Sequence, residues 1–163
     1  MTKYSDKTGT YSNNTLANRV ARIAVPAAIA GGIVLIIYFM IVKALGYYMQ
    51  TNLRWINYIL MIPVSIYAVQ KYIASSTGKT YLEAMVVSII AYSGAYFVLG
   101  LFMFIYLSID VQFMNYLYQL ALPELQLNPI AVFILLMGEG IIGGVVISFI
   151  VLQFFKNKIR KVA

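Results

Sequence analysis

The sequence has no cysteine and no histidine among its 163 residues. The lack of cysteine excludes disulfides and thiolate chemistry, and the lack of both residue types removes the ligands that most zinc sites use. A b-type haem normally needs an axial histidine, so a haem site within the chain is not expected either. No nucleophile–base pair can be built from histidine or cysteine, and the acids are scattered. We therefore expect no cofactor, no metal and no catalytic residues.

Charge is also scarce. Charged residues make up 10% of the chain and hydrophobic residues 62%, against roughly 25% and 45–50% in soluble globular domains. A membrane-spanning helix needs about 20 mainly apolar residues. Four such helices would use most of this chain, so the composition predicts an integral membrane protein without a sizeable domain outside the lipid.

Four apolar stretches are long enough to be spans, at about residues 23–45, 53–72, 84–107 and 129–155. They predict an all-α membrane protein built as an antiparallel bundle of four transmembrane helices. We expect one domain over residues 19–163, preceded by a disordered polar tail over residues 1–18. The first run, Ile23 to Val42, holds 20 uncharged residues and exceeds the 7–15 of a signal-peptide core, so we interpret it as a permanent span.

The basic residues are distributed unevenly around these stretches. Ten of the twelve lie before span 1, at the end of span 2, between spans 2 and 3, or after span 4. Only Lys43, near the end of span 1, and Arg54, near the start of span 2, border the connection between those two spans. Cytoplasmic connections are enriched in lysine and arginine, so both termini are expected in the cytoplasm. Because these cations flank spans, we expect them to meet lipid head groups and not nucleic acid. The residues assigned to topology are Arg19, Arg22, Lys71, Lys156, Lys158, Arg160 and Lys161.

Aromatic residues near the span ends predict interfacial belts. The outer belt is assigned Tyr47, Tyr48, Trp55 and Tyr58, and the inner belt is assigned Tyr72, Tyr81, Phe154 and Phe155.

A short amphipathic helix is expected between spans 3 and 4. The polar residues Gln112, Asn115 and Gln119 recur at helical spacing while the other faces are apolar. Asp110 can cap this helix by accepting the amides of its first turn. We favour a helix lying in the outer membrane interface; the alternative is an extension of span 3 into solvent.

Small residues four apart allow helix backbones to approach closely within lipid. Spans 1 and 4 both contain this pattern. The predicted helix-packing residues are Ala27, Ala28, Gly31, Gly32, Gly140, Gly143 and Gly144.

Glu139 is the one acidic residue expected deep inside a span, near the middle of span 4. A carboxylate at this depth is costly unless it is neutral, paired or wetted, which makes it a functional candidate. Three interpretations stay open. Glu139 can tie span 4 to polar groups such as Ser65, Ser93 or Tyr96; it can meet a helix of another protein; or it can carry a proton or cation across the membrane.

The stretch Gly78-Lys79-Thr80 matches the end of a phosphate-binding loop. That loop also needs a glycine five residues before Gly78 and a preceding strand. Position 73 is isoleucine and an apolar span precedes it, so we expect no nucleotide binding.

Parts of the chain resemble a family of small four-span bacterial inner-membrane proteins known only as a domain of unknown function. The resemblance lies in residues 78–84, which match a Gly-x-x-[Phe/Tyr]-x-x-Ala pattern, in residues 109–113, and in Asn128-Pro129 before the glycine-rich span 4. It covers about Lys71 to Lys161 and departs from the family at Val111, where proline is usual. The resemblance implies a four-helix protein of the bacterial inner membrane with both termini cytoplasmic, and no established activity.

These observations predict a non-catalytic accessory or structural subunit that packs against membrane lipids and against other integral membrane subunits or a second copy of itself. The alternative is a small oligomeric transporter or channel element that moves protons or cations through Glu139. An enzyme ranks third.

Overall fold

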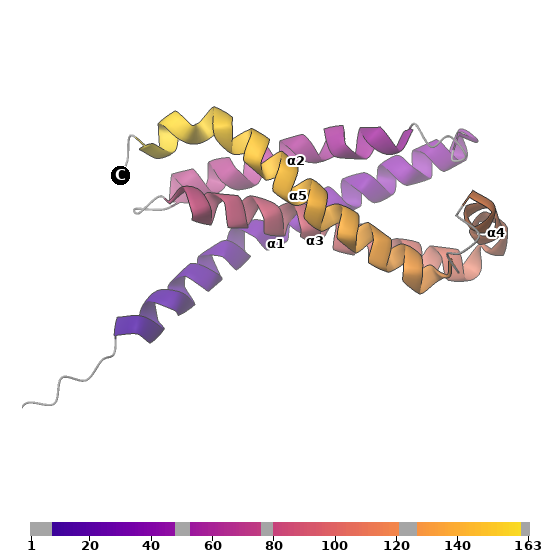
Figure 1. The fold of residues 1–163 in the computed structure, drawn as a ribbon, viewed down its shortest axis with the longest axis horizontal. Helices are drawn as coiled ribbons and strands as arrows, with labels where there is room; N and C mark the ends of the chain where they lie inside the picture. Colours follow the sequence, from indigo (N-terminus) through magenta and orange to yellow (C-terminus); the bar gives the residue numbers. More distant parts are fainter. Residues whose placement is uncertain (1–7, 48–52, 76–79, 121–126, 161–163) are drawn as a thin grey trace, which may run out of the picture.

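The structure is a computed structural model that describes residues 8–47, 53–75, 80–120 and 127–160. Within these ranges the chain forms five α-helices and no strand (Figure 1). The helices are α1 (Thr8–Ala44), α2 (Arg54–Ser75), α3 (Tyr81–Ile109), α4 (Val111–Leu120) and α5 (Pro129–Arg160).

Three helices in the described part of the chain are long and apolar enough to cross a membrane. They cover Val20–Ala44, Tyr81–Ile109 and Pro129–Asn157. The all-helical class and the predicted spans 1, 3 and 4 are confirmed to this extent. The stretch predicted as span 2 is helical as α2, but α2 is not among these three helices. It has a charged residue at each end and polar residues such as Gln70 between them, which lower its hydropathy.

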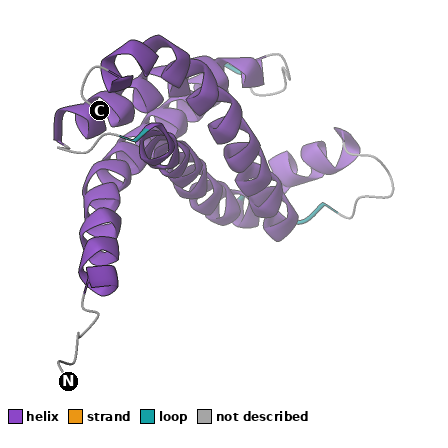
Figure 2. Ribbon diagram, turned by 60° about the vertical axis from the view of Figure 1, so that its left-hand side comes forward, coloured by secondary structure: helices purple, strands orange, loops and turns teal. Residues whose placement is uncertain are grey.

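The first helix begins earlier than the sequence suggested. Residues 8–18 were predicted to belong to a disordered tail, yet α1 is continuous from Thr8. Adding a residue to an existing helix costs far less than starting one, so a stable apolar helix can extend into a polar segment. Pro26 lies inside α1. Figures 1 and 2 show the first turns of α1 extending beyond the other helices.

The helix α3 lies at the centre of the fold. It contacts each of the other four helices, and its contacts with α1 and α5 are the most extensive in the structure. In Figure 1, α1 and α3 run in one direction while α2 and α5 run in the other. α2 and α5 contact each other less than either contacts α3.

The buried apolar residues form two clusters, one at each end of α3. At the end where α3 begins, Ile23, Tyr72, Ala84 and Leu152 pack together. The other cluster includes Leu35, Met61, Tyr96, Met103 and Phe113. The first cluster therefore brings together the middle of α1, the end of α2, the start of α3 and the end of α5.

Asp110 joins α3 to α4. Its amide donates to the Tyr106 carbonyl at 2.9 Å, which closes the last turn of α3. Its Oδ1 accepts from the Phe113 amide at 3.0 Å, so the same residue caps α4 as predicted. α4 presents Gln112, Asn115 and Gln119 outward, while Phe113 is buried. The predicted amphipathic helix is thus present.

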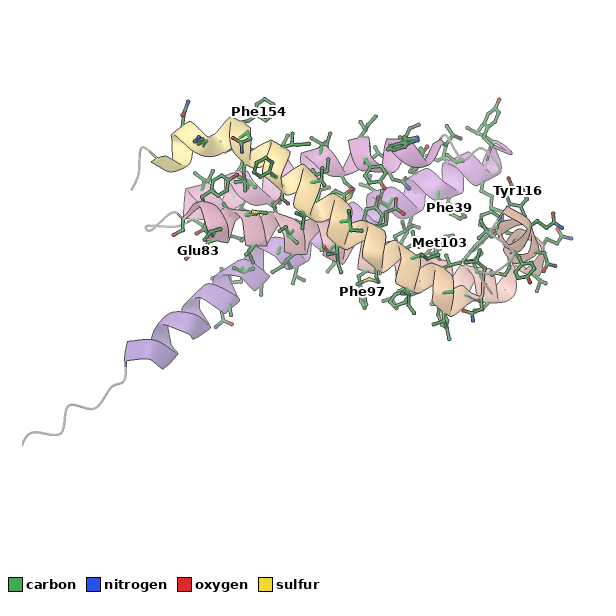
Figure 3. The ribbon with its side chains drawn as sticks, in the orientation of Figure 1. Phe39, Glu83, Phe97, Met103, Tyr116 and Phe154 are labelled. Atoms are coloured by element: carbon green, nitrogen blue, oxygen red, sulfur yellow. The ribbon has the colours of Figure 1, made fainter. Side chains whose placement is uncertain are left out.

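Aromatic side chains attach α4 to the rest of the protein. The Phe39 ring lies 5.4 Å from Tyr106 and 5.9 Å from Phe113, measured between centroids, and these rings come from α1, α3 and α4. Figure 3 shows Tyr116 on α4 at one end of the molecule and Glu83 at the opposite end.

Candidate functional site

The glycines of α5 face α3. A Cβ atom built at Gly140 would lie 2.5 Å from the Tyr96 Cβ, and one at Gly144 would lie 3.2 Å from the Ser93 Oγ. A side chain at Gly140 would force a shift of Tyr96 or of one helix, whereas one at Gly144 would require Ser93 to move by only a few tenths of an ångström. The Ser93 hydroxyl donates to the Gly140 carbonyl at 3.2 Å, which adds a polar contact to this crossing.

The small residues of α1 bring that helix onto α3 in the same way. A Cβ at Gly32 would lie 2.5 Å from the Val98 Cβ, and one at Gly31 would lie 3.0 Å from the Ala95 Cβ. Ala28 meets α3 at another glycine: a Cβ at Gly94 would lie 2.7 Å from the Ala28 Cβ. Ala27 is buried in the cluster at the start of α3. Within the chain, all seven predicted packing residues are therefore buried.

Glu139 precedes this glycine contact and lies on the side of α5 that faces α2. Its side chain is half-buried, and its Oε1 atom is shielded from solvent. It lines a groove of about 570 Å³ between α2 and α5. The groove exists because α2 and α5 both pack on α3 but contact each other only sparsely.

Apolar and aromatic groups form the rest of the groove. α2 contributes Trp55 and Tyr58, whose ring centroids lie 5.6 Å apart. α5 contributes the remaining lining residues, which are Ile142, Gly143, Val146 and Ile147. Glu139 is the one acidic residue of this lining, so the groove combines a carboxylate with two π faces in an otherwise apolar surface.

Two tyrosines of α3 lie beneath the groove. Tyr92 and Tyr96 are fully buried and stack with centroids 5.3 Å apart and planes inclined by 9°. A Cβ at Gly143 would lie 3.0 Å from the Tyr92 hydroxyl, which places that hydroxyl against the groove wall. Among the described residues, neither hydroxyl has a hydrogen-bond partner of normal geometry.

The serines expected near Glu139 have different surroundings. Ser93 bonds to the Gly140 backbone instead of to the carboxylate. The Ser65 hydroxyl is buried without a hydrogen-bond partner among the described residues. Nearer the start of α3, Ser88 accepts a hydrogen bond of 2.8 Å from Ser148 of α5, and this contact is buried.

Lys43, near the end of α1, pairs with Asp110. Its Nζ lies 2.7 Å from Asp110 Oδ2, and the Tyr106 hydroxyl donates to the same oxygen at 2.7 Å. The hydrogen bond from Lys43, with a second from the Phe113 amide, lowers the pKa of the Asp110 carboxyl below its usual value.

Among the basic residues assigned to topology, Arg22, Lys71 and Lys156 are exposed on α1, α2 and α5. Lys71 donates to the Tyr67 hydroxyl at 3.0 Å. The backbones of Arg19, Lys158 and Arg160 belong to α1 and α5, but the structure does not describe their side chains. Lys161 lies outside the described residues.

The described residues contain no group of three or more acidic, histidine or cysteine side chains that would hold a metal ion. Of the Gly78-Lys79-Thr80 stretch, Gly78 and Lys79 lie outside the described residues, while Thr80 precedes the first turn of α3.

The sequence identified Glu139 but not the residues that face it. Trp55 and Tyr58 were assigned to an aromatic belt at the membrane surface. A position in that belt explains amphipathic rings without requiring any contact with another helix. Their position one turn apart on α2 was the available signal, since residues three apart share a helix face. That this face meets Glu139 follows only from the packing of α2 and α5 on α3.

The comparisons with known proteins give no relative: no protein-family model matches the chain, and no curated protein or solved structure matches it.

Proposed function

We propose that this chain is a non-catalytic accessory or structural subunit of the bacterial inner membrane that packs against a partner membrane protein. The observation that carries the proposal is the exposure of α5. Within the apolar stretch that could cross a membrane, 17% of α5 is buried, against 44% of α3. α5 therefore packs on one side and leaves a long apolar face from Ile134 to Phe154 for lipid or a partner helix.

The proposed topology has four spans with both termini in the cytoplasm. α2 has 22 residues and, at 1.5 Å per residue, a length of about 33 Å, which matches the hydrocarbon core. The cluster at the start of α3 supports the orientation, because it gathers the parts of α1, α2 and α5 that carry Arg22, Lys71 and Lys156. A reporter that works only in the cytoplasm should be active when it is fused to the C-terminus, and a reporter that works only in the periplasm should be inactive there. Activity of the periplasmic reporter would contradict this topology.

Two adjacent phenylalanines allow a matched test of the partner surface. Phe154 is 81% exposed, whereas Phe155 is 9% exposed and belongs to the core (Figure 3). A photo-reactive phenylalanine analogue at position 154, illuminated in native membranes, should give one protein adduct of discrete mass. The same analogue at position 155 should react within the chain. The protein captured in the adduct should also co-purify, in stoichiometric amount, with the wild-type chain when membranes are extracted in mild detergent. Lipid adducts alone, together with free monomer, would exclude the accessory role.

A second candidate is a transporter or channel element that moves protons or cations through Glu139. It is favoured by a row of buried polar residues on one face of α3, where Ser88, Tyr92 and Tyr96 are four residues apart and lie beside the helix that carries Glu139. Purified protein in liposomes should then show a cation or proton flux that Glu139→Gln abolishes. Absence of flux, or flux unchanged by the substitution, would remove this candidate.

A further inference from the structure

The groove between α2 and α5 has the construction of a ligand site. Sites for small molecules occupy roughly 300–1,000 Å³ and are mainly apolar and aromatic, with a few polar groups that fix orientation. The present groove, about 570 Å³, has two aromatic residues, a carboxylate and three aliphatic side chains in its lining.

The charge of the groove selects the ligand class. Glu139 is its one acidic lining residue, and its Oε1 atom is shielded from solvent. An opposite charge within a few ångströms stabilises an ionised carboxylate in a medium of low dielectric constant.

The aromatic residues point to the same class. A cation lying over a tryptophan or tyrosine face is attracted by the negative face of the ring, and organic ammonium groups are recognised by several such rings together. Trp55 and Tyr58 present two rings 5.6 Å apart, inclined by 39°, in the same groove as the carboxylate. Trp55 is 70% exposed, so its ring is accessible to an incoming molecule.

From this combination we infer that the groove binds a small organic cation, an ammonium group attached to an apolar chain. The ammonium lies between Glu139 and the rings of Trp55 and Tyr58. The apolar chain lies along Ile142, Val146 and Ile147 on α5. This site does not depend on the accessory role, and failure of the cross-linking experiment would leave it intact.

Trp55 provides a direct assay because it is the single tryptophan of the chain. The probe is (2-bromoethyl)(hexyl)dimethylammonium, whose bromine lies next to the cationic centre and quenches tryptophan fluorescence on contact. Its control is the uncharged isostere in which a quaternary carbon replaces the ammonium nitrogen. Purified full-length protein in maltoside micelles avoids lipid head groups that carry ammonium. We expect saturable quenching by the cation and binding weaker by about tenfold or more for the isostere.

Two pairs of variants locate the site. Glu139→Gln should weaken binding of the cation by about tenfold or more, whereas Glu83→Gln, which removes a carboxylate outside the groove at the start of α3, should leave it unchanged (Figure 3). Val146→Phe should block the groove because Val146 lines it. Val145→Phe places the same ring on the neighbouring residue, which does not line the groove, and should bind as wild type.

Three outcomes would overturn the inference. They are equal quenching by the cation and its isostere, unchanged binding in Glu139→Gln, and absence of saturable quenching in the wild-type protein. If Glu139→Gln fails to elute as the wild type does on size exclusion, the Val146 and Val145 pair decides, and equal binding by these two variants excludes the groove.

Discussion

Substitution of Gly140 by alanine is expected to separate α3 and α5, whereas the same change at Gly138 is expected to be harmless. A Cβ at Gly140 would lie 2.5 Å from the Tyr96 Cβ, while a Cβ at Gly138 would have no atom of the described residues within 4 Å. Carbon atoms in contact normally lie about 3.5–4.0 Å apart. The Gly140 variant must therefore move one helix by about 1 Å or displace Tyr96.

Tyr96 has little freedom to move. It is fully buried and stacks on Tyr92. Overpacking of this kind typically costs about 1–3 kcal/mol. Alanine is also about 1 kcal/mol more favourable than glycine at a helical position, and both variants share this gain. The difference between Gly140→Ala and Gly138→Ala is therefore expected to equal the overpacking cost, about 1–3 kcal/mol.

The measurement is the free energy of unfolding in maltoside micelles, obtained by titration with a denaturing detergent and followed by circular dichroism. Gly138→Ala should be as stable as wild type or more stable. Gly140→Ala should be less stable than Gly138→Ala. Equal stability of the two variants would refute the close crossing of α3 and α5.

Three further predictions concern polar and backbone features. Since the folded-state pKa of Asp110 is lowered, its stabilisation should be present above its unfolded pKa of about 3.9. That stabilisation should disappear as the pH falls through the folded-state pKa of Asp110. Thermal unfolding measured at a series of pH values should show this loss in the wild type but not in Asp110→Asn. Parallel curves for the two proteins would contradict the prediction. Ser148→Ala should cost about 0.6 kcal/mol, up to about 1.7, and a double-mutant cycle with Ser88→Ala should recover this coupling; additive effects would show that the 2.8 Å bond contributes nothing. Gly46 has a φ of +76° and open space around it, so Gly46→Ala should lose about 1 kcal/mol through backbone strain alone, as measured by unfolding, and an unchanged stability would argue against this turn.

The parts of the fold that the sequence predicted are those set by local patterns. Length and apolarity define the helices of spans 1, 3 and 4, and the spacing of Gln112, Asn115 and Gln119 defines α4. Asp110 was recognisable as a cap because capping depends on residues only three positions away. These features require no knowledge of which helices are neighbours.

The parts that were missed depend on packing between distant segments. Small residues in spans 1 and 4 indicated close contacts, but their common partner, α3, follows from the three-dimensional arrangement. Glu139 was identifiable from its cost in lipid, whereas its pairing with Trp55 and Tyr58 in one groove was not. The early start of α1 was missed because residues 8–18 lack the apolar periodicity that marks a helix.

The central position of α3 has a consequence for biosynthesis. Proteins emerge from the ribosome N-terminus first, at about 5–20 residues per second. α1 and α2 are therefore made before the helix against which the glycines of α1 pack. When α1 and α2 have been made, their faces that contact α3 are still uncovered, and native packing can finish only after α3 has been followed by α5.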